Sequence, residues 1–101
     1  MLSIVIPTSN AEDTIGELLE SIVAQDFRGD YEVIIIDNGS TDNTERTVRK
    51  YMGVLPIRYF KYGEKLGHAG AINEGIAKAK GEFILVLHDD LVLGERNWIS
   101  E

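Results

Sequence analysis

Four short apolar runs, rich in β-branched residues and separated by stretches with helical spacing, constrain the fold of this chain more than any other feature. The runs are Leu2–Pro7, Tyr31–Asp37, Ile57–Lys61 and Phe83–Leu87. The second run is nearly continuous in its apolar part, which is typical of a parallel strand covered on both faces. The connections are long enough for the crossovers that parallel pairing needs. The chain therefore predicts an α/β fold with a mostly parallel, open, Rossmann-like sheet and helices on both faces.

Three of the connecting segments have helical patterns. The first has apolar residues at helical spacing from Ile15 to Val23, and Asn10 is its expected N-cap. The second helix spans residues 43–52. The third spans residues 71–79, has small residues on its inner face, and follows a glycine-rich loop over residues 63–70. The alternating third strand is expected near an edge of the sheet.

Composition and charge exclude several classes of protein. A chain of 101 residues with 44% hydrophobic residues is one globular domain, or part of one. The net charge of −7 has the wrong sign for a protein that grips nucleic acid with its whole surface. No secretory-signal pattern is present, and the longest apolar run is far shorter than the roughly 20 residues of a membrane span. Without cysteine, a metal ion would have to bind carboxylates or one of two histidines.

Polar residues follow the predicted strands, at the edge where open parallel sheets bind ligands. Asp37 could accept hydrogen bonds from a ribose or a base, or simply hold a turn. Asp89 and Asp90 could hold Mg²⁺ or Mn²⁺, or form a solvated loop. His88 is a metal ligand or a turn residue, and Lys65, with His68, lies in a loop that either cradles phosphate or only connects.

Four blocks carry a more specific pattern: Ser3–Asn10, Val33–Thr44, Leu66–Gly75 and Gly81–Asp90. In this order and at this spacing they resemble the signature blocks of family 2 inverting glycosyltransferases with the GT-A fold, over nearly the whole chain. Motifs of dinucleotide oxidoreductases, P-loop NTPases, zincins and serine hydrolases are absent.

The resemblance implies a role for each matching position. It places seven residues around the nucleotide sugar: Pro7, Thr8, Glu12, Asp37, Lys65, Asn73 and Asp89. Asp37 would bind the base or ribose. His88–Asp90 would replace the family's Asp-x-Asp motif, with Asp90 as the main ligand of Mn²⁺ or Mg²⁺ and His88 assisting. The sequence departs from the family at Ser9, where an aromatic residue is common, at Lys65 and at His88.

The resemblance also implies a reaction. A sugar would pass from a nucleoside-diphosphate sugar to a hydroxyl of a glycan, lipid-linked or protein acceptor, with inversion and with the help of a divalent metal. Family members carry the catalytic base in a C-terminal half, so we expect residues 1–101 to be a donor-binding domain that lacks it. The implied location is cytoplasmic or peripheral at the inner face of a membrane, without a transmembrane segment.

Two other functions remain open. One is a non-catalytic nucleotide-binding or assembly module. The other is a receiver-like signalling domain with Asp37 as phosphoacceptor, although the first strand ends in Pro7 and Thr8 rather than in the acidic pair that such a domain needs. Exposed apolar surface around residues 83–87 and Trp98 would favour self-association.

Overall fold

The computed structural model describes residues 1–25, 29–63 and 66–90. Its sheet has the order β3-β2-β1-β4, and every neighbouring pair is parallel. The strands are β1 (Leu2–Thr8), β2 (Tyr31–Asn38), β3 (Ile57–Tyr62) and β4 (Phe83–Val86). The predicted parallel α/β fold is therefore confirmed, and the third strand lies at an edge as expected.

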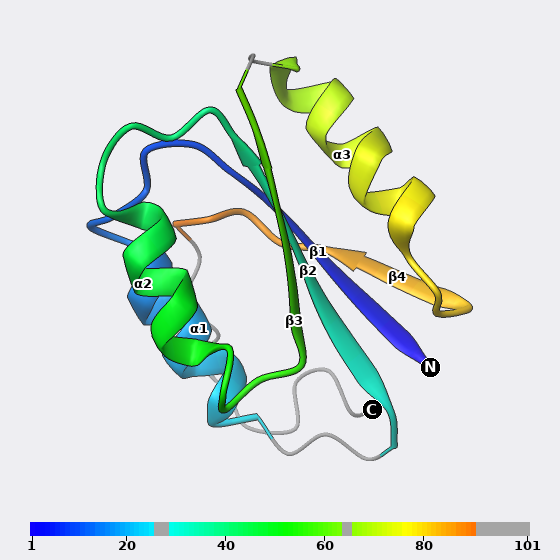
Figure 1. Cartoon of the computed structure of the whole chain (residues 1–101). Helices are drawn as coiled ribbons and strands as arrows, with labels where there is room; N and C mark the ends of the chain where they lie inside the picture. Colours follow the sequence, from blue (N-terminus) through cyan, green and yellow to red (C-terminus); the bar gives the residue numbers. More distant parts are fainter. Residues whose placement is uncertain (26–28, 64–65, 91–101) are drawn as a thin grey trace.

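Helices cover both faces of the sheet, as Figure 1 shows. Helices α1 (Ile15–Val23) and α2 (Thr44–Tyr51) lie on one face, and α3 (Gly67–Lys78) lies on the other. The alternation of side chains along the strands divides the core accordingly. Ile4, Ile6, Val33 and Ile35 face α1 and α2, whereas Val5, Ile34 and Ile36 face α3.

Helix α3 packs against the sheet through small residues, as its sequence predicts. Ala71 is buried, and a Cβ atom added at Gly75 would lie 2.3 Å from Cγ1 of Val5. Glycine is therefore required at this helix position by the closeness of the strand beneath it. This close approach fixes α3, and with it the residues of its first turn.

A buried ionic network joins the strands at their amino ends. Glu32 accepts hydrogen bonds from Arg58 Nη1 at 2.9 Å, from the Ser3 hydroxyl at 2.7 Å and from the Lys80 N–H at 2.7 Å. The Gly81 N–H donates in turn to the Ser3 hydroxyl at 2.8 Å. Burial alone would raise the pKa of Glu32, but these hydrogen bonds and the Arg58 charge outweigh it and hold the pKa below its ordinary value.

Two local predictions are wrong. Asn10 does not cap α1: the helix begins at Ile15 after Thr14, and Asn10 has a φ of +48° and accepts a hydrogen bond from the Thr41 N–H. Helix α3 begins at Gly67, four residues before the predicted start, so His68 belongs to the helix and not to a loop. In both cases contacts with another segment or with the sheet override the local signals.

The edge strand β4 exposes apolar side chains, in part as predicted. Phe83 and Ile84 are 69% and 42% exposed, whereas Leu87 is buried. Trp98 lies outside the described residues. Self-association through this edge stays a prediction, which sedimentation velocity over a range of concentrations would test.

Candidate functional site

The strand order itself indicates where a ligand binds. The chain runs outward from β1 to β2 and β3, and then returns to place β4 on the other side of β1. The connections thus diverge between β1 and β4, and in open α/β sheets the crevice at the carboxyl end of such a point holds the ligand.

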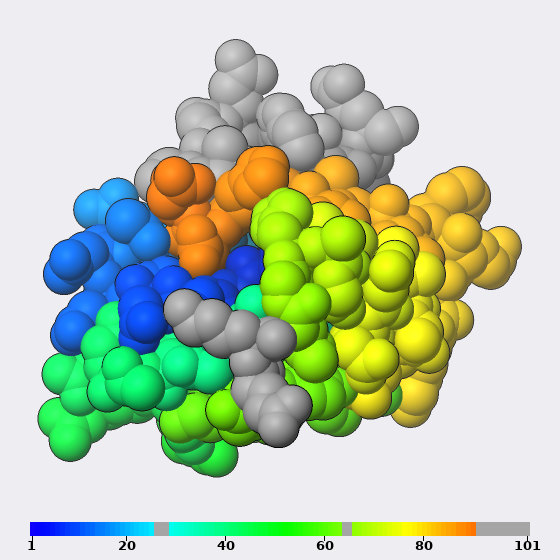
Figure 2. All heavy atoms as spheres, turned by 90° about the horizontal axis from the view of Figure 1, so that it is seen from above, coloured from blue at the N-terminus to red at the C-terminus, as the bar shows by residue number. Residues whose placement is uncertain are grey.

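A pocket of about 280 Å³ lies at this point. Its lining residues come from the end of β1, the end of β2, the first turns of α3 and the segment after β4: Pro7, Thr8, Ser9, Asn38, His68, Ala71, His88 and Asp89. Figure 2 looks onto this edge, with the end of β1 (blue) between the segment after β4 (orange) and the start of α3 (yellow-green). Four elements of the fold therefore converge on one concave site.

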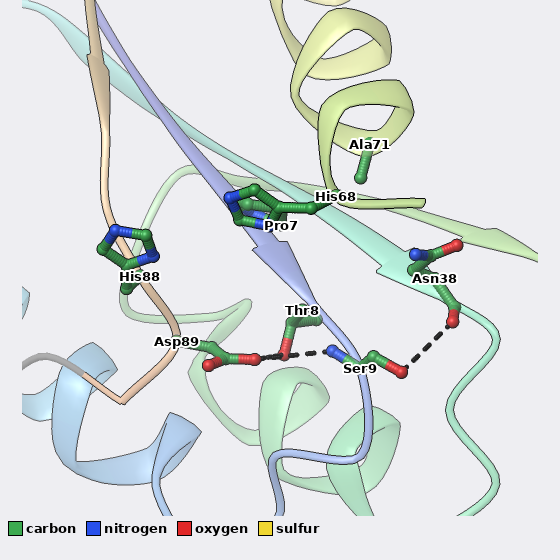
Figure 3. A pocket seen from close by; sticks show the side chains of 8 residues that line it. All are labelled: Pro7, Thr8, Ser9, Asn38, His68, Ala71, His88 and Asp89. Atoms are coloured by element: carbon green, nitrogen blue, oxygen red, sulfur yellow. Dashed lines mark hydrogen bonds between the residues drawn. The ribbon is translucent and has the colours of Figure 1, made fainter. Parts of the chain in front are cut away.

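Asp89 is tied to the end of β1. Its Oδ2 accepts a hydrogen bond from the Thr8 hydroxyl at 3.0 Å and lies 3.4 Å from the Ser9 backbone nitrogen (Figure 3). The Ser9 hydroxyl donates to the Asn38 carbonyl at 3.2 Å, so the chain after β1 is tied to β2 as well. A carboxylate held in this way has a fixed position before any ligand arrives.

Two imidazole rings face each other in the pocket. His68 comes from the first turn of α3 and His88 from the segment after β4. Their ring centroids are 5.8 Å apart, and their planes differ by 8°. Both side chains are exposed, so each has a ring face or a nitrogen that a ligand can reach.

Asp37 lies at the end of β2 but does not line the pocket. It is fully buried; its Oδ1 accepts from the Ser40 N–H at 2.8 Å, and its Oδ2 accepts from the Tyr59 hydroxyl. Burial, together with this contact to Asp37, raises the pKa of Tyr59. Asp37 therefore holds the loop after β2, which was one of its two predicted roles. Each carboxylate oxygen keeps a second lone pair, and no part of the side chain is exposed in this structure.

The loop after β2 in turn holds the loop after β1. The backbone N–H groups of Asn10, Ala11 and Glu12 donate to side-chain oxygens of Ser40 at 2.9 Å, Thr44 at 2.8 Å and Asp42 at 3.2 Å. Asp42 also accepts from Thr44. Burial acts against the charge of Asp42, but these hydrogen bonds prevail and lower its pKa. This exchange replaces the N-cap that the sequence predicted for α1.

The predicted site residues divide into three groups. The pocket brings together Pro7, Thr8, His88 and Asp89. Glu12, Asn73 and Asp90 are exposed and, like Asp37, are not among the lining residues, whereas Lys65 lies outside the described part of the chain. The sequence alone did not identify Asn38 as a lining residue. The Oδ1 atom of Asn38 accepts a hydrogen bond from the Leu66 N–H at 2.5 Å. The position of Asn38 directly after Asp37, at the end of a predicted strand, was the sequence signal that could have identified it as a site residue.

The residues after β4 include side chains of the types that bind divalent metals. Within the described residues, no cluster of three or more histidine or acidic side chains is arranged to hold an ion. His88 offers an imidazole nitrogen and Asp90 an exposed carboxylate. Mg²⁺ and related ions bind through one or two protein carboxylates when substrate phosphates and water supply the remaining ligands. The residues present fit a metal that a diphosphate helps to hold.

No described helix has the length and apolar character needed to cross a membrane.

The profile of the family described as "Glycosyl transferase family 2" matches residues 3–101. The poly(ribitol-phosphate) beta-N-acetylglucosaminyltransferase TarS of Staphylococcus aureus is 37% identical over 90 residues, which cover 87% of this chain and 16% of TarS. The poly(ribitol-phosphate) beta-glucosyltransferase of Bacillus spizizenii is 39% identical over 99 residues, which cover 92% of this chain and 15% of that protein.

Solved structures agree with these relatives. TarS residues 1–349 in complex with UDP match with a TM-score of 0.88 and 34% identity, over 95% of this chain and 29% of that one. The mannosyltransferase PcManGT of Pyrobaculum calidifontis, in complex with GDP-Man and Mn²⁺, matches with a TM-score of 0.88 and 30% identity, over 95% and 29% of the two chains. The chain thus spans less than a third of each of these proteins. It belongs to glycosyl transferase family 2 and has the Rossmann-like GT-A fold of these neighbours.

Proposed function

We propose that residues 1–101 form the donor-binding domain of an inverting glycosyltransferase, which takes a sugar from a nucleoside diphosphate with the help of a divalent metal. The observation that carries the proposal is the pocket between β1 and β4, where Asp89 is already fixed by Thr8 and Ser9. It is supported by relatives whose structures hold UDP or GDP-Man.

In this proposal the pocket holds the nucleoside, and Asp89 accepts a hydrogen bond from a ribose hydroxyl. Pro7 and Thr8 form the wall along β1. Asp37 contributes through the backbone that it holds, Asn38 to Ser40, and through its remaining lone pairs. Glu12, Lys65 and Asn73 are proposed to lie beside the donor without lining the pocket itself.

His88 and Asp90 would hold Mn²⁺ or Mg²⁺ together with the diphosphate. When bound, the metal would neutralise negative charge on the departing nucleoside diphosphate. His88 places its imidazole at the pocket wall, and Asp90, two residues later and exposed, is free to turn toward a diphosphate. A single displacement at the anomeric carbon inverts its configuration. No residue of this chain is assigned as the base that deprotonates the acceptor hydroxyl.

The acceptor is proposed to be a glycan, a lipid-linked sugar or a protein, and the reaction to belong to cell-envelope polymer synthesis. The named relatives support this class of product, since two of them are poly(ribitol-phosphate) glycosyltransferases. A place in the cytoplasm, or at the inner face of a membrane, remains part of the proposal.

Calorimetric titration with UDP, GDP and dTDP, each with and without Mn²⁺, tests the donor site. We expect one nucleotide to bind in a Mn²⁺-dependent way, and Asp90→Ala and Asp37→Ala to weaken binding at least tenfold. Asp13→Ala removes an exposed carboxylate outside the pocket and is the matched control, with an expected change of less than twofold. Circular dichroism verifies that each variant is folded.

The possible outcomes separate the parts of the proposal. Binding that is independent of Mn²⁺ and of Asp90 would refute the metal role while keeping the donor site. No binding of any nucleotide to the folded chain would refute the donor site. Tight binding without sugar transfer by any longer form of the protein would favour the non-catalytic module.

A further inference from the structure

The two imidazole rings are the only aromatic surfaces among the described residues that line the pocket. They come from elements far apart in the sequence, α3 and the segment after β4, yet their planes differ by only 8°. Figure 3 shows both rings on the same side of Thr8 and Ser9. The fold therefore stacks two nearly parallel imidazole rings from separate elements against each other, and we call His68 and His88 the imidazole pair.

The spacing of the two rings decides how a planar ligand can stack on this imidazole pair. A third ring inserted between them would need a gap of about 7 Å, which is twice the contact distance of about 3.5 Å between stacked atoms. The centroids are only 5.8 Å apart, so the gap is too small. The separation instead lies within the range of offset stacking, and a planar ligand must lie on the outer face of one ring.

The opposite side of the pocket is small and polar. Ser9 turns its hydroxyl toward the Asn38 carbonyl, and Ala71 presents only a methyl group. Figure 3 shows the Asn38 side chain at the edge of the pocket, across from the imidazoles. A flat heterocycle that stacks on an imidazole can thus direct its polar edge toward amide and hydroxyl groups.

We propose that His68 stacks on the base of the donor nucleotide and is a specificity-determining residue of this chain. This inference rests on the proposed donor site. His88 stacks on His68, and its proposed metal contact is compatible with that stacking, because a ligating nitrogen uses the ring plane whereas stacking uses the ring face. His68 is exposed, stacks on His88 and makes no hydrogen bond with the described residues, so replacing it removes little other than the ring.

Three variants separate a stacking role from a polar one. His68→Phe keeps a flat ring without nitrogen, His68→Gln keeps polarity without a ring, and His68→Ala keeps neither. Base–aromatic stacking contributes about 1–3 kcal/mol, so at its lower end we expect His68→Ala and His68→Gln to weaken UDP or GDP binding about five- to tenfold. His68→Phe should stay within about twofold of the original chain. Inorganic pyrophosphate, which has no base, should bind all four proteins equally.

A spectroscopic readout tests the contact directly. In NMR spectra of the 101-residue chain, the ring protons of His68 should shift upfield when UDP or GDP is added and should not shift with pyrophosphate. The inference is overturned if His68→Phe is as weak as His68→Ala, if His68→Gln binds like the original chain, or if pyrophosphate binding falls in parallel. If the original chain binds no nucleotide, the proposed donor site fails first; if it binds nucleotides and all three variants match it, only the stacking role fails.

Discussion

Strand β2 carries a buried carboxylate near each of its ends, and the two have different partners. Glu32, at the amino end, pairs with the Arg58 guanidinium and also accepts from the Ser3 hydroxyl and the Lys80 N–H. Asp37, at the carboxyl end, accepts from the Ser40 N–H and the Tyr59 hydroxyl, and forms no ion pair with the residues that the structure describes.

The difference separates a carboxylate that has a counterion in the fold from one that has none among the described residues. At the amino end the Arg58 guanidinium neutralises the Glu32 carboxylate. This network therefore stabilises the sheet without a ligand. At the carboxyl end neutral donors hold the carboxylate, and no cation among the described residues pairs with it. A buried charge without a counterion costs stability, and such costs are concentrated at functional sites.

Arg58→Met gives the largest expected effect at the amino end. The substitution leaves the buried Glu32 carboxylate without its cation, and breaking a buried pair in this way costs roughly 3–5 kcal/mol. Since the Arg58 side chain is 33% exposed, we expect about 3 kcal/mol by urea unfolding. Arg49→Met, which breaks an exposed pair with Glu45, is the control and should cost less than about 0.5 kcal/mol. Equal losses of unfolding free energy for Arg58→Met and Arg49→Met would contradict a structural role of the Glu32 network.

Glu32→Gln should cost about 2 kcal/mol at pH 7, and the cost should depend on pH. The pKa of Glu32 is lower in the folded chain than in the unfolded chain. Its stabilising contribution is therefore complete at a pH above the pKa that Glu32 has in the unfolded chain. The contribution is lost as the pH falls through the lowered folded-state pKa. Unfolding free energies of both proteins between pH 3 and pH 7 should therefore converge at the acid end. A difference that stays constant over this range would contradict the charged role of Glu32.

Tyr59→Phe gives the smallest expected effect, about 1 kcal/mol, because it removes one hydrogen bond from a neutral donor to Asp37 and leaves the Ser40 N–H bond in place. The ring still packs against the core on the α1 and α2 face. If unfolding measurements showed a larger loss than for Arg58→Met, the carboxyl end would be the stronger structural anchor, and the contrast between the two carboxylates would be reversed.

Much of the fold could be predicted because its signals are local. The apolar runs gave all four strands to within a residue or two, and the small residues around Ala71 and Gly75 anticipated the close packing of α3. Asn10 shows where local signals fail. It is a suitable capping residue before α1, but its side chain accepts a hydrogen bond from Thr41 in the loop after β2 instead of capping the helix.

The sequence by itself determined the order of strands and helices, and the placement of polar residues after the strands, because β-branched runs and helical spacing act over a few neighbouring residues. Tertiary structure alone decided which of those polar residues meet. The contact of Asp89 with Thr8 joins residues 81 apart, that of Asp37 with Tyr59 joins residues 22 apart, and the stacked His68–His88 pair joins α3 to the segment after β4. Such contacts depend on the sheet order and on the close approach of α3, which exist only once the whole domain has folded.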